Sequence, residues 1–139
     1  MKNTMTAIDI ETIKAYHQKR DAEKRAQREA ERQQWLERVR EIVPRVAAQF
    51  PEIEQVVLFG SIIQPGRFRP DSDIDVAVAY DFTTLEGVSA ESAFWRALEQ
   101  ELRRNVDVRP LRDVIAEIAA SQGEEVYSCK DAHRESPIS

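Results

Sequence analysis

The sequence has 139 residues, of which 42% are hydrophobic, enough for one modest domain with a single core. Its net charge of −5 argues against a general nucleic-acid-binding protein, which normally carries a basic surplus or a basic face. The one cysteine, Cys129, cannot form an internal disulfide, and neither a signal peptide nor a long apolar run is recognisable. We therefore expect a cytoplasmic protein that binds neither membranes nor nucleic acids.

The N-terminal segment is long, charged and favourable to helix. From about Ile8 to Val43 there is no glycine or proline, and alanine, glutamate, glutamine, arginine and lysine dominate. Such a helix would reach roughly 50 Å. Between His17 and Gln34 the only apolar residues are three alanines, so residues 1–33 are predicted to be a helical arm outside the core. The arm is either a solvated extension, which its interleaved charges favour, or a surface for a partner or second copy.

A different pattern begins near residue 34. From Trp35 to Phe50 apolar residues recur at helical spacing and form a face that can pack on a sheet, and Pro44 is expected to kink or divide this helix. The apolar run Val56–Phe59 predicts a central strand. Gly60 permits a tight exit from that strand, and Ser61 is expected to cap a short helix. Such a turn offers backbone N–H groups and a hydroxyl to phosphate oxygens.

Three aspartates lie in stretches that otherwise predict strands. Asp73 and Asp75 alternate with branched apolar residues, so both carboxylates are expected on one face of the sheet, roughly 6.5 Å apart. Asp107 lies between Val106 and Val108, and it would join them if the two strands are neighbours. A single Asp-x-Asp is more often a turn entering a strand, but three aspartates in two strands are unusual.

The chemistry of these oxygen ligands indicates the metal. With no histidine or cysteine nearby, carboxylates suit Mg²⁺, or Mn²⁺ as an alternative, better than zinc. A magnesium ion held by few carboxylates usually takes its other ligands from water and substrate phosphates. The pattern therefore favours phosphoryl or nucleotidyl transfer.

The remaining elements complete an α/β fold with a small mixed sheet flanked by helices and a long charged N-terminal helix. Residues 81–88 are expected to form a loop near the site, and Ser89 to cap a helix that ends at Arg104. A last helix is predicted over Leu111–Ala120. We expect the globular domain to span residues 34–127 and a flexible tail to span 128–139.

Taken together, three motifs resemble the nucleotidyltransferase superfamily that includes DNA polymerase beta, and within it the minimal nucleotidyltransferase (MNT) domains. They are Leu58–Ser61, Ser72–Val76 and Val106–Val108, in the order and at about the spacing of the family. The resemblance implies two Mg²⁺ ions, with Asp73 and Asp75 binding both and Asp107 completing the ion on the nucleophile side. It also implies that Gly60 and Ser61 contact the triphosphate.

One segment departs from the family pattern. Between Ser61 and Asp73 the chain is one residue longer than usual, lacks the usual arginine and contains Pro65, which would interrupt a helix that opens at Ser61. Arg67 or Arg69 is a candidate to supply the missing charge.

The resemblance further implies transfer of AMP from ATP, with release of pyrophosphate, to a tyrosine of a partner HEPN toxin, so that the protein acts as an antitoxin. Two alternatives stay open. One is a small-molecule nucleotidyltransferase of the aminoglycoside-modifying type. The other is a catalytically degenerate antitoxin that only binds its partner.

Overall fold

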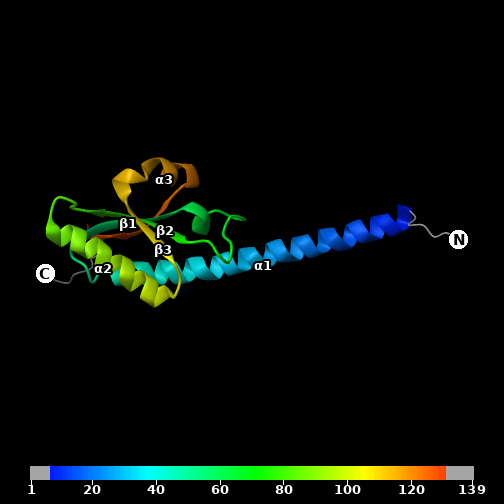
Figure 1. Cartoon of the computed structure of the whole chain (residues 1–139), viewed down its shortest axis with the longest axis horizontal. Helices are drawn as coiled ribbons and strands as arrows, with labels where there is room; N and C mark the ends of the chain where they lie inside the picture. The colour runs from blue at the N-terminus through cyan, green and yellow to red at the C-terminus, as the bar shows by residue number, and fades with distance from the viewer. Residues whose placement is uncertain (1–6, 131–139) are drawn as a thin grey trace.

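The structure is a computed structural model that describes residues 7–130 (Figure 1). It consists of helices and a four-stranded mixed sheet of order β3-β2-β1-β4, which confirms the predicted fold class. Strand β1 is antiparallel to β2 and to β4, and β2 is parallel to β3. In chain order the elements are α1 (Ala7–Ala47), β1 (Ile53–Phe59), the 3₁₀ helix η1 (Gly60–Ile63), β2 (Ile74–Tyr80), α2 (Leu85–Leu102), β3 (Val106–Pro110), the 3₁₀ helix η2 (Leu111–Asp113), α3 (Ile115–Ser121) and β4 (Glu124–Ser128).

Helix α1 has an exposed N-terminal half and a C-terminal half that packs on the sheet. Its N-terminal half projects away from the sheet, and the side chains from Asp9 to Arg28 are exposed (Figure 1). The buried face begins at Arg32 and continues through Leu36, Val39 and Val43. Each fully buried leucine or valine contributes about 1.5–3 kcal/mol, so this face fixes α1 to the sheet. No helix within residues 7–130 is long and apolar enough to cross a membrane.

The sequence predicts that Pro44 kinks or divides this helix, and the expectation of a division is wrong. Helix α1 continues through Pro44 to Ala47. Proline lacks one backbone donor, but only three helical residues follow it. The buried side chains of Val43, Val46 and Ala47 hold this last turn against the core.

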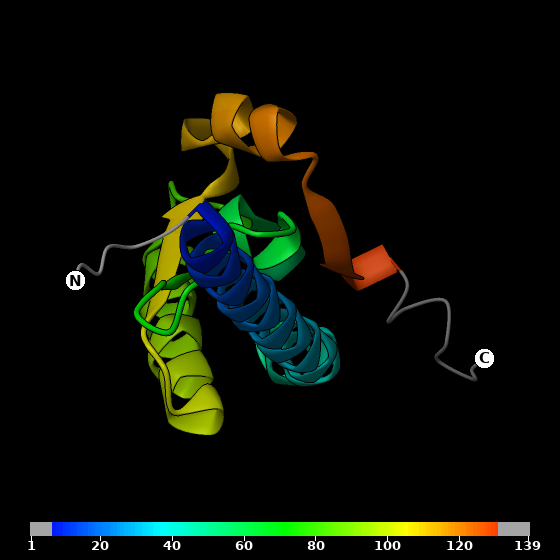
Figure 2. The same ribbon diagram turned by 90° about the vertical axis from the view of Figure 1, so that its right-hand side faces the viewer.

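The sheet separates two apolar clusters of different size. The larger lies beneath α1 and α2, which run side by side under one face (Figure 2), and it includes Ile74, Val76 and Val78. The smaller lies on the face covered by α3 and contains Val57, Phe59, Ala77 and Val114. The predicted alternation of strand β2 is therefore confirmed.

Three features of the fold differ from the sequence prediction. Helix α2 begins at Leu85, where the Thr84 hydroxyl accepts the Gly87 N–H, so Ser89 is not the cap and the expected loop over 81–88 ends earlier. The predicted last helix is divided into η2 and α3. Strand β4 was not predicted at all, and it pairs with the edge of β1. Most of the expected tail, residues 131–139, lies outside the described residues.

Candidate active site

The register of β2 and β3 brings two of the three aspartates together. Asp75 and Asp107 are direct partners in the parallel ladder. The larger apolar cluster contains the residues on either side of each aspartate: Ile74, Val76, Val106 and Val108. Because side chains alternate along a strand, both carboxylates point to the opposite face, which α3 partly covers. Asp73 lies just before β2 rather than inside it, and it is exposed.

The phosphate turn predicted at Gly60 lies against Asp75. Phe59, the last residue of β1, is paired with Asp75, and Gly60 follows with φ of +77°. A Cβ on Gly60 would overlap Oδ2 of Asp75 and would lie 3.1 Å from its Cγ. Two independent reasons therefore require glycine at position 60: the positive φ and the close approach of the Asp75 carboxylate.

The carboxylates are close enough to influence one another. Asp75 is half-buried, and its pKa is raised to about 6 by burial, then by the charge of Asp107, then by that of Asp73. Arg109 acts in the opposite direction. A site that raises the pKa of a carboxyl group in this way favours a bound cation, since a cation offsets both the burial and the repulsion.

The turn after β1 differs from the expected helix cap. The 3₁₀ helix begins at Gly60, so Ser61 lies within its first turn and is not the N-cap. The Gly60 N–H donates to the Ser121 hydroxyl at 3.1 Å, and this hydroxyl in turn donates to the Glu117 carbonyl at 3.0 Å. Ser121 thus holds the turn, and a phosphate cradle here depends on the Ser61 hydroxyl and on the N–H groups that follow Gly60.

Arg67 and Arg69 lie in the segment after this turn, and both are exposed. Arg69 lines a shallow hollow with Arg28 and Trp35 of α1. This hollow lies beside α1. Helix α1 covers the sheet face opposite to the one that carries Asp75. A contribution of either arginine to nucleotide binding stays a prediction.

The donor set fits a hard cation. Within the part of the chain that the structure describes, no group of three or more acidic, histidine or cysteine side chains is placed so that it could hold a metal ion, and this includes the three aspartates. Magnesium does not require such a cage, because it is commonly bound by one or two carboxylates together with water and substrate phosphates. Asp75 and Asp107 are a pair of neighbouring carboxylates of this kind, and the role of Asp73, Asp75 and Asp107 as metal ligands stays a prediction.

A separate apolar pocket lies at the other end of the same strands. It has a volume of about 220 Å³ and is lined by Tyr80, Phe82, Leu111 and Arg112, among others. No aspartate lines this pocket. The candidate site is therefore the carboxylate face beside Gly60, and the pocket is not part of it.

Comparison with known families agrees with this geometry. The family described as "Polymerase beta, Nucleotidyltransferase" matches residues 41–132, which include β1, β2, β3 and all three aspartates. The chain belongs to this family. No curated protein sequence matches the chain significantly.

Similar solved structures come from toxin–antitoxin complexes. A chain of a mutant MntA–HpeT toxin–antitoxin complex is 23% identical with a TM-score of 0.52, and the match covers 64% of this chain and 73% of that one. A toxin–antitoxin structure with AMP-PNP is 25% identical with a TM-score of 0.48, covering 60% and 68%. The complex of a tri-AMPylated HEPN toxin from Shewanella oneidensis with its MNT antitoxin is 20% identical with a TM-score of 0.45, covering 74% and 77%. The first of these likenesses shows that the fold is shared.

Proposed function

We propose that this protein is a metal-dependent nucleotidyltransferase that transfers AMP from ATP to a hydroxyl group, and that the acceptor is a tyrosine of a partner HEPN toxin. The observation that carries the proposal is the pairing of Asp75 with Asp107 on the sheet face beside Gly60. Membership of the polymerase beta family supports nucleotidyl transfer. The resemblance to MNT domains, together with the toxin–antitoxin complex of the same fold, indicates which acceptor to test first.

The residues of the site suit the charge changes of this reaction. The acceptor oxygen attacks the α-phosphorus, the bond from that phosphorus to the bridging oxygen breaks, pyrophosphate leaves, and the hydroxyl proton passes to water. Mg²⁺ ions would stabilise the negative charge on the entering and leaving oxygens. Asp75 and Asp107 would hold these ions with Asp73, and the turn after Gly60 would orient the triphosphate. Because Asp75 is half-buried and fixed on a strand, its carboxylate is positioned before substrate arrives.

One observation favours a second candidate, an antitoxin that binds without catalysis. The Gly60 N–H already donates to Ser121, so one donor expected for the triphosphate is engaged. Neutralisation of a toxin through binding alone would not require that donor. The two candidates differ in whether label is transferred.

The test is transfer of label from ATP labelled at the α-phosphate. The chain is incubated with Mg²⁺ and the product of the adjacent gene, and AMP is expected on that product. Asp75→Asn should lower the rate on the order of a hundredfold or more, because it weakens the ion site. Asp71→Asn is the matched control, since Asp71 is an exposed aspartate four residues earlier, outside the strand. Toxin neutralisation without label favours the binding-only antitoxin, and transfer that survives Asp75→Asn refutes the assigned site.

A further inference from the structure

The segment Ile62–Ser72 connects the phosphate turn to Asp73. It contains no strand and no helix beyond the end of η1, and most of its side chains from Pro65 onward are exposed. Ile62, at the start of the segment, is fully buried in the core, and from Pro65 onward Phe68 is the one buried apolar side chain. From Pro65 onward packing therefore gives the segment little support, and the position of this part depends largely on polar contacts with neighbouring elements.

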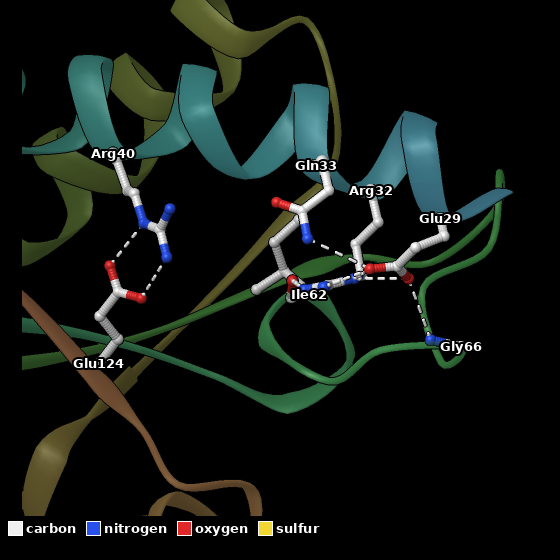
Figure 3. A network of polar contacts seen from close by, with 7 residues as sticks. All are labelled: Glu29, Arg32, Gln33, Arg40, Ile62, Gly66 and Glu124. Atoms are coloured by element: carbon white, nitrogen blue, oxygen red, sulfur yellow. Dashed lines mark hydrogen bonds and ion pairs between the residues drawn. The ribbon is translucent and has the colours of Figure 1, made fainter. Parts of the chain in front are cut away.

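The first of these contacts comes from α1. Arg32 is 4% exposed and donates to the Ile62 carbonyl at 2.9 Å. Its guanidinium also forms a pair with Glu29, with contacts of 3.0, 3.1 and 2.6 Å. Glu29 in turn accepts the Gly66 N–H at 3.2 Å. Figure 3 shows the two side chains reaching from α1 to the segment, so they fix its beginning.

The second set of contacts comes from Arg104, which follows α2. Its guanidinium donates to three backbone carbonyls near the end of the segment: Arg69 at 2.8 Å, Pro70 at 3.1 Å and Ser72 at 2.7 Å. The last of these carbonyls directly precedes Asp73. Arg104 therefore fixes the end of the segment as Arg32 fixes its beginning.

Arg104 is itself held in place by two aromatic rings. Its guanidinium carbon lies 4.8 Å from the ring centre of Trp35 and 4.3 Å from that of Phe68. Planar stacking and several donors in a fixed arrangement are properties of arginine that lysine does not share. A lysine at position 104 keeps the positive charge and loses the stacking on the two rings, and a lysine at position 32 or 104 loses the fixed arrangement of several donors.

We propose that Arg32 and Arg104 are positioning residues, which hold the two ends of the segment Ile62–Ser72 so that the phosphate turn and Asp73 keep their places beside Asp75. This role rests on the proposed nucleotidyl transfer. Neither arginine needs to touch the nucleotide, since both act through backbone carbonyls. Displacement of a positioned group by about 1 Å can lower a rate a hundredfold, so the loss of either arginine should affect catalysis.

The test compares Arg32→Lys and Arg104→Lys with Arg40→Ala. Arg40 lies on the same helix as Arg32 and binds Glu124 of β4 through two contacts of 2.7 Å, away from the segment (Figure 3). Three quantities are measured: the melting temperature, hydrogen exchange of the amides in residues 62–72, and the KM for ATP together with kcat. Both lysine variants should exchange these amides at least about tenfold faster and lose about ten- to a hundredfold in kcat/KM, whereas Arg40→Ala should do neither.

The outcomes separate this proposal from the proposed function. If wild-type protein transfers no AMP, nucleotidyl transfer fails, and unchanged exchange in the lysine variants would refute the anchoring as well. If wild-type protein transfers AMP, the proposal is overturned by folded variants with wild-type kcat and KM, even where exchange is faster. Should Arg32→Lys not fold, Glu29→Gln serves instead, since it weakens the contact to Gly66 and leaves the Ile62 contact in place.

Discussion

Replacement of Gly60 by alanine tests the close approach of the turn to the carboxylate site. Gly60 has φ of +77°, and an alanine there costs about 1–2 kcal/mol from backbone conformation alone. The added methyl group would also overlap Oδ2 of Asp75, and forcing extra atoms into a packed site typically costs another 1–3 kcal/mol or so. We therefore expect Gly60→Ala to lower the free energy of unfolding by about 2–5 kcal/mol.

Gly66→Ala is a close control for this change. Gly66 has almost the same φ, +78°, but nothing lies within 4 Å of an added Cβ. Its loss should be about 1–2 kcal/mol, from backbone conformation only. The difference between the two variants then measures the overlap with Asp75.

Urea unfolding at neutral pH gives both values. The reasoning is refuted if the two variants lose the same stability. A second check is the pair of changes Gly60→Ala and Asp75→Ala in one chain. Removal of the carboxylate should recover most of the overlap energy, which appears as a coupling of about 1–3 kcal/mol between the two sites.

Three further predictions concern pH and the arm. Because the pKa of Asp75 is raised from 3.8 to about 6, the folded state binds its proton more tightly, and metal-free protein should lose stability as the pH rises through this window. Asp75→Asn should remove this loss of stability, which is measured as the melting temperature at a series of pH values. If the variant and the wild-type protein show the same pH dependence, the raised pKa of Asp75 is contradicted. The pKa of Glu29 is lowered from 4.5 to about 2, chiefly by its hydrogen bonds with Arg32. The stability that this pair contributes should therefore be lost as the pH falls through that window. In Glu29→Gln the melting temperature should depend less on pH over this range. Removal of residues 1–27 should leave the melting temperature within a few degrees, whereas removal of 1–33 should lower it clearly, because Arg32 is then lost; equal melting temperatures would show that Arg32 contributes nothing.

The core of the candidate site could be predicted because strands place side chains by a period of two. The branched residues around Asp75 and Asp107 indicate which face is buried, and the aspartates follow on the other face. What sequence could not give is that the two strands are parallel neighbours in this register. That pairing depends on α2, which carries the chain from the end of β2 back to the start of β3.

The missed features share a physical cause, which is that their signals are local and weak. Strand β4 is a short, half-buried edge strand of sequence Glu-Glu-Val-Tyr-Ser, so it lacks clear alternation. Thr84 and Ser89 are both acceptable caps, and only the hydrogen bond to Gly87 distinguishes them. Arg32 looks like every other arginine of the charged arm, and its burial becomes visible only when the segment after the phosphate turn packs beside it.

The uninterrupted course of α1 has a mechanical consequence. The twenty exposed residues from Asp9 to Arg28 form a rod about 30 Å long, and the same rod carries Glu29 and Arg32 where it meets the domain. A molecule that binds the far end of this rod would therefore lie in a fixed direction and at a fixed distance from the aspartates. The inner end of the helix is fixed through Glu29 and Arg32 to the segment that leads into β2, so the rod and the aspartates keep one geometry.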